Sequence, residues 1–281
     1  MTRQRPASPL LLCAHQELIL AIRSRWTQIF AAVFASLSLA VAASGYVLSG
    51  GAGMQDFART AASLVQLVLL LTPLTSLVIG VLALAPERGA AELLFSQPVS
   101  RRTILYGRLL GLFCALGAAQ AIGLGGAGLV VFSRSGESGM AGYGVLFLGA
   151  LVLTAVFLGI AALLVSGGVG RRAKALALAL IVWFSAVVLF DVVALGLASL
   201  LPSKAASRVL IGAVLVNPID AFRTGALLAI QGTTAFGAAS LAFLRFTRGP
   251  LGAALLLVVS AALWLALPAV LAARRLERAD L

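Results

Sequence analysis

Charged residues are scarce in this chain: Asp, Glu, Lys and Arg make up 11% of its 281 residues, and only 9 of these residues are acidic. A soluble domain carries about 25% charged residues. Since 61% of the residues are hydrophobic, the surface of any soluble core would itself have to be apolar. Disordered chains are also excluded, because they are polar and charged. The sequence therefore predicts a polytopic membrane protein.

Side chains that ligate metals or act as nucleophiles are equally few. The chain has one histidine, His15, two cysteines, Cys13 and Cys114, and no CxxC, MxxM or HxH motif. Soft metal ions need clusters of such groups, so we expect neither a metal site nor a cofactor.

A Walker A sequence is also absent, so this chain is not expected to bind ATP or to be an enzyme. The tetrapeptide at 136–139, GESG, resembles the nucleophile motif of rhomboid proteases. A serine hydrolase needs a base within hydrogen-bond reach. The single histidine, His15, is predicted on the opposite side of the membrane, which excludes that chemistry.

Six apolar stretches are long enough to cross a bilayer as helices, which takes about 20 residues each. They are continuous and rich in Leu, Ala and Gly, as is typical of helices in lipid, and do not alternate as membrane strands do. We predict an all-α fold, one transmembrane domain over 1–281, with spans at 28–48, 61–85, 103–132, 144–166, 175–201 and 251–273.

The basic residues give the orientation. Two thirds of the 21 Lys and Arg residues fall in segments on the side of the N-terminus, and the two short loops on the other side carry one each. The positive-inside rule then places both termini in the cytoplasm of a bacterium, with the chain in its inner membrane. The net charge of +12 lies at the ends of the spans, so we expect its partner to be the lipid bilayer and not nucleic acid.

A segment before the first span, 9–25, mixes apolar with polar residues in the manner of an amphipathic helix on the inner surface. The alternative is a long, frayed start to the first span.

A second segment, 209–230, carries Asp220 and Arg223 near its centre, and this disfavours a seventh span. Asn217 is expected to cap a helix that begins at Pro218. We therefore interpret it as an interfacial helix whose apolar face, in the headgroup region, is formed by Ile219, Phe222, Ala226 and Ile230.

Asp191 is the ionisable residue that lies deepest in a predicted span. Charges within the membrane face protein or water and usually mark function, so Asp191 is our candidate for a gate in the translocation path. The alternative is a structural residue near the outer end of the span, protonated or capped by the backbone or by Ser185.

Glycines in the third span predict close packing. Gly107 and Gly111 are spaced to let another helix approach closely. One candidate is a helix of a second copy of the chain, which would make this face a dimer contact. The GxGxxG pattern at 123–128 lies within an apolar span and follows no strand, so we interpret it as packing.

The connection between the second and third spans, 86–102, is predicted to be cytoplasmic. The charged pair Glu87 and Arg88 precedes a short amphipathic stretch, and Ser100 is placed to cap a helix that begins at Arg101. A short helix with one apolar side suits a groove on a soluble partner. The alternative is an ordinary solvated loop.

This connection resembles the motif of type-2 ABC transporter permeases, a family with six spans per subunit. Ala91 stands where a threonine is usual in that family. The resemblance implies that ATP is hydrolysed by a separate ATPase subunit and that the contacts to it come from Glu87, Arg88, Gly89, Glu92, Leu93, Leu94, Pro98 and Arg101.

The long outer loop, 202–250, contains VNPIDAFR at 216–223 and resembles that of the permeases that serve maturation of nitrous oxide reductase. This implies a homodimer with two copies of a cytoplasmic ATPase, a periplasmic β-helical partner, and export of a sulfur species or another factor for copper sites. The candidate docking residues are Asn217, Pro218, Asp220 and Arg223. A permease for drug, lipid or peptide cargo and a non-transporting membrane anchor remain the alternatives.

Overall fold

The structure, a computed structural model, describes residues 8–47, 54–85, 99–135, 139–166, 172–232 and 243–278. Within these ranges the chain is helical with short turns, so the predicted all-α class is confirmed. The elements are α1 (Pro9–Arg23), α2 (Arg25–Val47), α3 (Met54–Leu84), α5 (Arg101–Ser135), α6 (Met140–Val165), α7 (Arg172–Phe184), the π-helical turn η1 (Ser185–Leu189), α8 (Phe190–Ser199), α9 (Ser203–Val216), α10 (Pro218–Gln231) and α12 (Pro250–Arg278).

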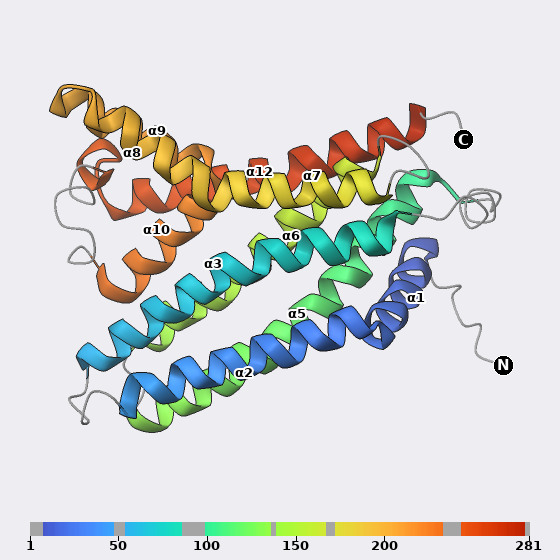
Figure 1. The fold of residues 1–281 in the computed structure, drawn as a ribbon, viewed down its shortest axis with the longest axis horizontal. Helices are drawn as coiled ribbons and strands as arrows, with labels where there is room; N and C mark the ends of the chain where they lie inside the picture. The colour runs from blue at the N-terminus through green and yellow to red at the C-terminus, as the bar shows by residue number, and fades with distance from the viewer. Residues whose placement is uncertain are drawn as a thin grey trace.

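In the described part of the chain, six helical stretches are long and apolar enough to cross a membrane. They are α2, α3, α5, α6, the continuous run α7–η1–α8, and α12, and they lie over the six predicted stretches. Figure 1 shows them side by side along the long axis of the molecule. We call the end that holds α1 and the last turns of α12 the N/C end, and the opposite end the far end.

Helices α3, α5 and α6 form the centre of the bundle. Just over half of the most apolar window of each is buried, compared with 6% for α7–η1–α8 and 11% for α12. Gln120 of α5 ties the three central helices together, because its amide nitrogen donates to Thr72 of α3 at 3.2 Å and to Thr154 of α6 at 2.7 Å. The outer helices instead expose large apolar side chains, as suits a surface that faces lipid or another subunit.

The N-terminal amphipathic segment forms a helix of its own. Ser8 caps α1 by accepting a hydrogen bond from the Leu11 amide, and Pro9 occupies the first helical position. The backbone is extended at Ser24, which separates α1 from α2. The alternative of a frayed start to the first span is therefore wrong.

The glycine pair of α5 does bring another helix close, but that helix is α1 of the same chain. A Cβ built on Gly107 would lie 2.6 Å from Cys13 Cβ, and one on Gly111 would lie 2.8 Å from Glu17 Cβ. The dimer contact that we considered for this pair is thus incorrect, because α1 already occupies the face. Three of the four glycines in 123–128 pack against neighbouring side chains, as predicted: Gly123 faces Phe34, Gly126 faces Leu39 and Gly128 faces Tyr143.

The helix predicted to begin at Pro218 is α10, but the residues before Asn217 belong to a second helix, α9, which the prediction did not include. Two helices, α9 and α10, meet at Asn217 with a bend of 100°, the geometry of a broken span or a re-entrant loop. The local signals were right: Asn217 accepts a hydrogen bond from the Ile219 amide at 3.1 Å, and Pro218 begins α10. From α12, Ser260 and Trp264 donate to the last carbonyls of α9 and so fix the break.

The apolar face of α10 also differs from the expectation. We predicted it in the headgroup region, but it packs against the bundle. Ile219 and Ala226 belong to the buried core, Phe222 lies over Gly149 of α6, and Ile230 lies over Gly142. Apolar periodicity identifies the buried face of a helix but not whether lipid or protein covers it.

Candidate functional site

The predicted coupling residues other than Arg101 lie outside the described residues. These are Glu87, Arg88, Gly89, Glu92, Leu93, Leu94 and Pro98. The two flanks of the connection are described, since α3 ends at Leu84 and α5 begins at Arg101. As predicted, Ser100 caps α5: its hydroxyl accepts from the Thr103 amide at 3.2 Å. The ends of the connection are therefore fixed points of the bundle.

Two arginines hold the last turn of α3. Arg108 of α5 donates to the Ala83 carbonyl at 2.5 Å, and Arg172 of α7 donates to the Leu82 carbonyl at 3.1 Å. These carbonyls carry the negative end of the helix dipole and have no partner within the helix, so guanidinium groups suit them. The entrance to the connection is thereby fastened to α5 and α7.

Arg108 also makes an ion pair that the sequence analysis did not foresee. Its Nε donates to the Glu17 carboxylate of α1 at 2.8 Å, and 7% of the Glu17 side chain and 18% of the Arg108 side chain are exposed. The flanking Gly107 and Gly111 allow α1 to approach closely enough for this contact. One guanidinium therefore joins three helices: α1, α5 and α3.

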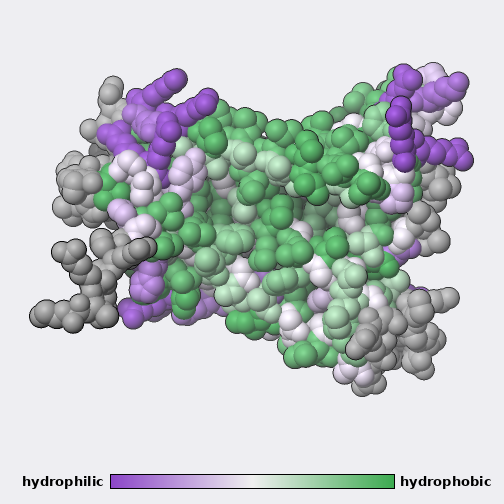
Figure 2. All heavy atoms as spheres, turned by 180° about the vertical axis from the view of Figure 1, so that it is seen from behind, coloured by the Kyte–Doolittle hydropathy of each residue, from purple (hydrophilic) through white to green (hydrophobic). Residues whose placement is uncertain are grey.

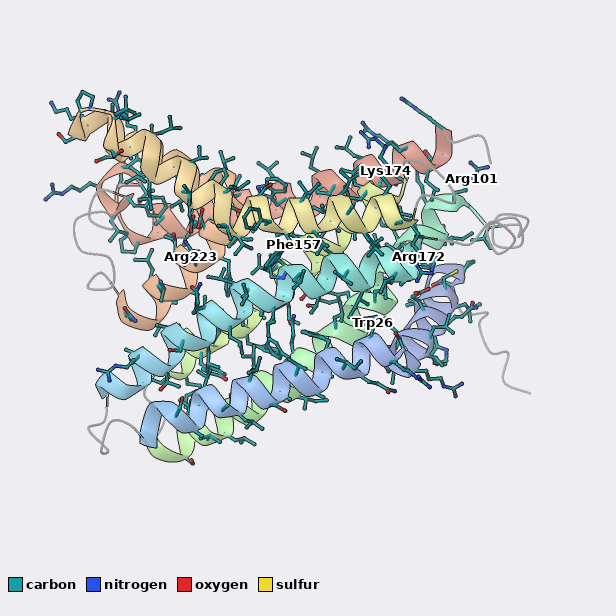
Figure 3. All side chains as sticks on the ribbon, viewed as in Figure 1. Trp26, Arg101, Phe157, Arg172, Lys174 and Arg223 are labelled. Carbon is teal, nitrogen blue, oxygen red and sulfur yellow. The ribbon has the colours of Figure 1, made fainter. Side chains whose placement is uncertain are left out.

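The exit from the connection is held by the end of α12. Arg101 donates to the Leu276 carbonyl at 3.0 Å, and Arg102 forms an ion pair with Glu277. Figure 3 shows Arg101, Arg172 and Lys174 gathered at the N/C end. Both flanks are thus bound to helices from distant parts of the sequence, so a displacement of either flank would be passed on to the bundle.

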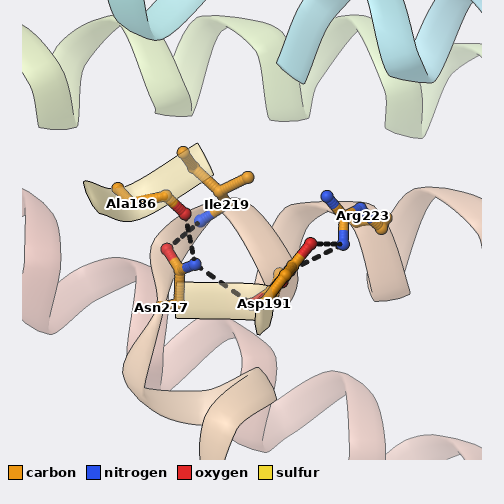
Figure 4. A network of polar contacts seen from close by, with 6 residues as sticks. Ala186, Asp191, Asn217, Ile219 and Arg223 are labelled. Carbon is orange, nitrogen blue, oxygen red and sulfur yellow. Dashed lines mark hydrogen bonds and ion pairs between the residues drawn. The ribbon is translucent and has the colours of Figure 1, made fainter. Parts of the chain in front are cut away.

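A second polar cluster lies where η1, α8 and α10 meet, towards the far end (Figure 4). Arg223 donates to Asp191 at 2.8 Å and to Asp220 at 2.9 Å. Asn217 donates to Asp220 at 3.0 Å and to the Ala186 carbonyl, in the π-helical turn, at 2.8 Å. One cation thus lies between two carboxylates and fastens α10 to the fifth spanning helix.

The cluster joins residues that the sequence analysis had treated separately. Asp191 was a gate candidate, and Asn217, Pro218, Asp220 and Arg223 were docking candidates. Asp191 pairs with Arg223, and not with the backbone or Ser185, the partners that we had considered. Asn217 and Asp220 are buried, and Arg223 is 26% exposed. The gate and docking roles of these residues stay predictions.

A metal site would need several ligating side chains close together. Among the residues that the structure describes, no three His, Cys, Asp or Glu side chains lie close enough to hold a metal ion. The polar side chains described above form ion pairs and helix caps that join neighbouring helices.

Taken together, the six spanning helices, the amphipathic helix before them and the anchored connection between the second and third spans define a transporter permease. The family model for ABC-2 family transporter proteins matches residues 11–281, and the chain belongs to this family. Two curated relatives are called probable ABC transporter permease protein NosY. The one from Stutzerimonas stutzeri is 34% identical over 81% of this chain and 85% of its own, and the one from Pseudomonas aeruginosa is 33% identical over 90% of each.

Proposed function

We propose that this chain is the permease of a bacterial inner-membrane ABC transporter that works as a homodimer with two copies of a cytoplasmic NosF-like ATPase. Both termini, and with them the N/C end, face the cytoplasm. Residues 86–102 form the coupling segment, and Glu92 and Leu93 are among its contacts to the ATPase. The observation that carries the proposal is the anchoring of both flanks of this segment to helices α1, α7 and α12 through arginines.

The mechanism follows from that anchoring. ATP binding closes the two ATPase subunits and displaces the coupling segments that they hold. Each displacement acts on the end of α3 and the start of α5, because these are its covalent neighbours. Since Arg108, Arg172 and Arg101 fasten these ends to other helices, the bundle moves between two packings as a unit. Nucleotide thus shifts a population between two states by binding one of them more tightly.

The far end supports a second part of the proposal, a periplasmic partner similar to NosD. Lys204 and Arg208 at the start of α9 are exposed, and the described residues of α9 include no acidic side chain. Arg223 is already paired with Asp191 and Asp220. The basic side chains of α9, and not Arg223, therefore make the main contacts with the periplasmic partner. Basic side chains of this kind orient an acidic partner and speed its encounter more than they raise affinity. The cargo under this proposal is a sulfur species or another factor for the copper sites of nitrous oxide reductase.

Affinity purification in mild detergent tests this assembly. The wild-type permease is expected to bring down equal numbers of ATPase chains together with the β-helical partner. Glu92→Arg should abolish ATPase recovery, because it places a cation on the docking face, and should leave membrane insertion and the β-helical partner intact. Lys204→Glu is the matched control, a charge reversal at the far end that should leave ATPase recovery unchanged.

Each other result assigns a different function. Normal ATPase recovery with Glu92→Arg would contradict the coupling assignment. Recovery of an ATPase without a β-helical partner would point to a permease for drug, lipid or peptide cargo. Recovery of neither would point to a non-transporting anchor.

A further inference from the structure

Helices α6, α10 and α12 enclose an apolar groove of about 560 Å³ on the side of the bundle. The groove exists because small residues line parts of it: Gly225 of α10 and Ala254 of α12 carry little or no side chain, and a Cβ on Gly225 would meet only Leu257, at 3.5 Å. Larger apolar side chains form the rest of the wall, among them Leu148, Val152 and Phe222.

The length of the groove matches one leaflet of a bilayer. Its lining runs from Val145 to Val156 on α6 and from Pro250 to Ala261 on α12. At 1.5 Å per residue each stretch is about 16 Å long. The hydrocarbon core of a bilayer is about 30 Å thick, so the groove spans about half of it, beginning at the far end.

The rim of the groove faces hydrocarbon. The lining residues Leu148 and Val258 are 63% and 64% exposed, and Leu251, which follows the lining residue Pro250, is 76% exposed. Figure 2, which views the molecule from behind, shows a broad hydrophobic surface between two polar ends. Polar groups are costly in such a setting, and a water-filled apolar groove there would be unfavourable. An acyl chain of a lipid can fill the groove in place of water.

Two arginines lie next to lining residues in the sequence, just before α12 begins. Arg245 follows the lining residue Leu244, and Arg248 lies two residues before the lining residue Pro250, where α12 begins. Both arginines are exposed, and the Arg248 amide donates to the Arg245 carbonyl at 3.3 Å, so the two residues lie in one turn of the chain. The amides at the start of the 29-residue α12 add a positive dipole end at the same place.

We propose that this groove binds an anionic phospholipid. One acyl chain lies between α6, α10 and α12, and the phosphate is held by Arg245 and Arg248 at the start of α12. The site favours an anionic headgroup because two cations lie beside it, and it favours a phospholipid over a small anion because the wall below them is apolar for the length of a leaflet. The assignment does not depend on the identity of the transported cargo.

Native mass spectrometry of the delipidated full chain tests the site, with dioleoyl phosphatidylglycerol and dioleoyl phosphatidylcholine as probes. The wild type should bind phosphatidylglycerol more tightly. Replacing both arginines (Arg245→Gln with Arg248→Gln) should weaken phosphatidylglycerol binding about 30-fold and leave phosphatidylcholine binding little changed. The matched control removes two charges from α9, outside the groove (Lys204→Gln with Arg208→Gln), and should not alter either affinity.

Gly225→Leu fills the groove and should weaken both lipids, and Ala254→Leu does the same from α12 if the first variant fails to fold. Equal affinities of the wild type for the two lipids, or an equal loss in the α9 control, would overturn the proposal. So would unchanged binding in the filled variants. A disulfide between two copies carrying Ala254→Cys, with Cys13 and Cys114 replaced by serine, would show that a second copy covers the groove and would also overturn it.

Discussion

Arg108 and Glu17 lie 91 positions apart in the sequence and form a largely buried ion pair, with 2.8 Å between the guanidinium Nε and a carboxylate oxygen. The same guanidinium donates to the Ala83 carbonyl, three residues before the proposed coupling segment begins. Force applied to that segment by an ATPase would therefore reach the amphipathic helix α1 through one side chain. Glu17 and Arg108 are positioning residues in this account.

Removing the charge of Arg108 should destabilise the permease strongly. Arg108→Gln leaves the Glu17 carboxylate buried without its cation and the Ala83 carbonyl without its donor, a loss of about 3 kcal/mol. Glu17→Gln should cost less, because the amide oxygen still accepts from Arg108. Thermal unfolding in detergent measures the stability of both variants. In the reconstituted transporter, both variants should hydrolyse more ATP per transport event than the wild type.

The ion pair between Arg102 and Glu277 is the matched control. It lies at the same end of the bundle, but 55% and 38% of its side chains are exposed, so water replaces the lost partner. Glu277→Gln should leave the melting temperature and the ATP hydrolysed per transport event close to the wild-type values. Equal effects of Glu277→Gln and Glu17→Gln would contradict the special role of the buried pair.

Adding even one methyl group at Gly111 should destabilise the protein. In Gly111→Ala the new Cβ would clash with the Ala14 carbonyl oxygen and lie 2.8 Å from Glu17 Cβ, both in α1. Overpacking of this kind costs about 1–3 kcal/mol and should displace α1. Gly125→Ala, in the same helix with nothing within 4 Å, should instead stabilise by up to about 1 kcal/mol through helix propensity. Thermal unfolding of the two variants in parallel should show a lower melting temperature for Gly111→Ala and a higher one for Gly125→Ala.

The cluster around Arg223 predicts an asymmetric response. Asp191→Asn keeps a hydrogen-bond acceptor beside Arg223, which still pairs with Asp220, so the loss of stability should be about 1 kcal/mol. Arg223→Gln leaves two carboxylates facing each other and should cost more. Exchanging the two charges (Asp191→Arg with Arg223→Asp) should recover part of that loss if the pair acts as a clamp.

Transport assays on the same variants decide the role of Asp191. Unchanged transport in Asp191→Asn, at equal protein levels, would assign it to structure alone. Lost transport at normal stability would support the gate.

Local signals in the sequence predicted local features well. The apolar runs predicted six spans because a bilayer-crossing helix must be apolar for about 20 residues. Ser100 and Asn217 were predicted as caps because a cap bonds to amides two or three residues away. The break of the chain at Asn217 was visible as a start signal for α10, but the 100° bend was not, since Ser260 and Trp264 of α12 help to set it.

Contacts between distant segments were beyond the sequence. Asp191 and Arg223 were both singled out, yet nothing along the chain shows that the π-helical turn and the bend bring them together. Glu17 lies in the segment 9–25, for which the sequence predicts an amphipathic helix but no partner. The signal that could have found its partner is Arg108 between Gly107 and Gly111, because a charge between two small residues in a span indicates a close polar neighbour.

The central claim is that residues 86–102 face the cytoplasm and bind the ATPase. The most direct measurement places a single cysteine at Glu92, with Cys13 and Cys114 replaced by serine, and labels it with a membrane-impermeant maleimide. The account predicts labelling in inverted membrane vesicles, protection there when the ATPase is bound, and no labelling in intact spheroplasts. Labelling in intact spheroplasts would place the segment on the periplasmic side and contradict the account.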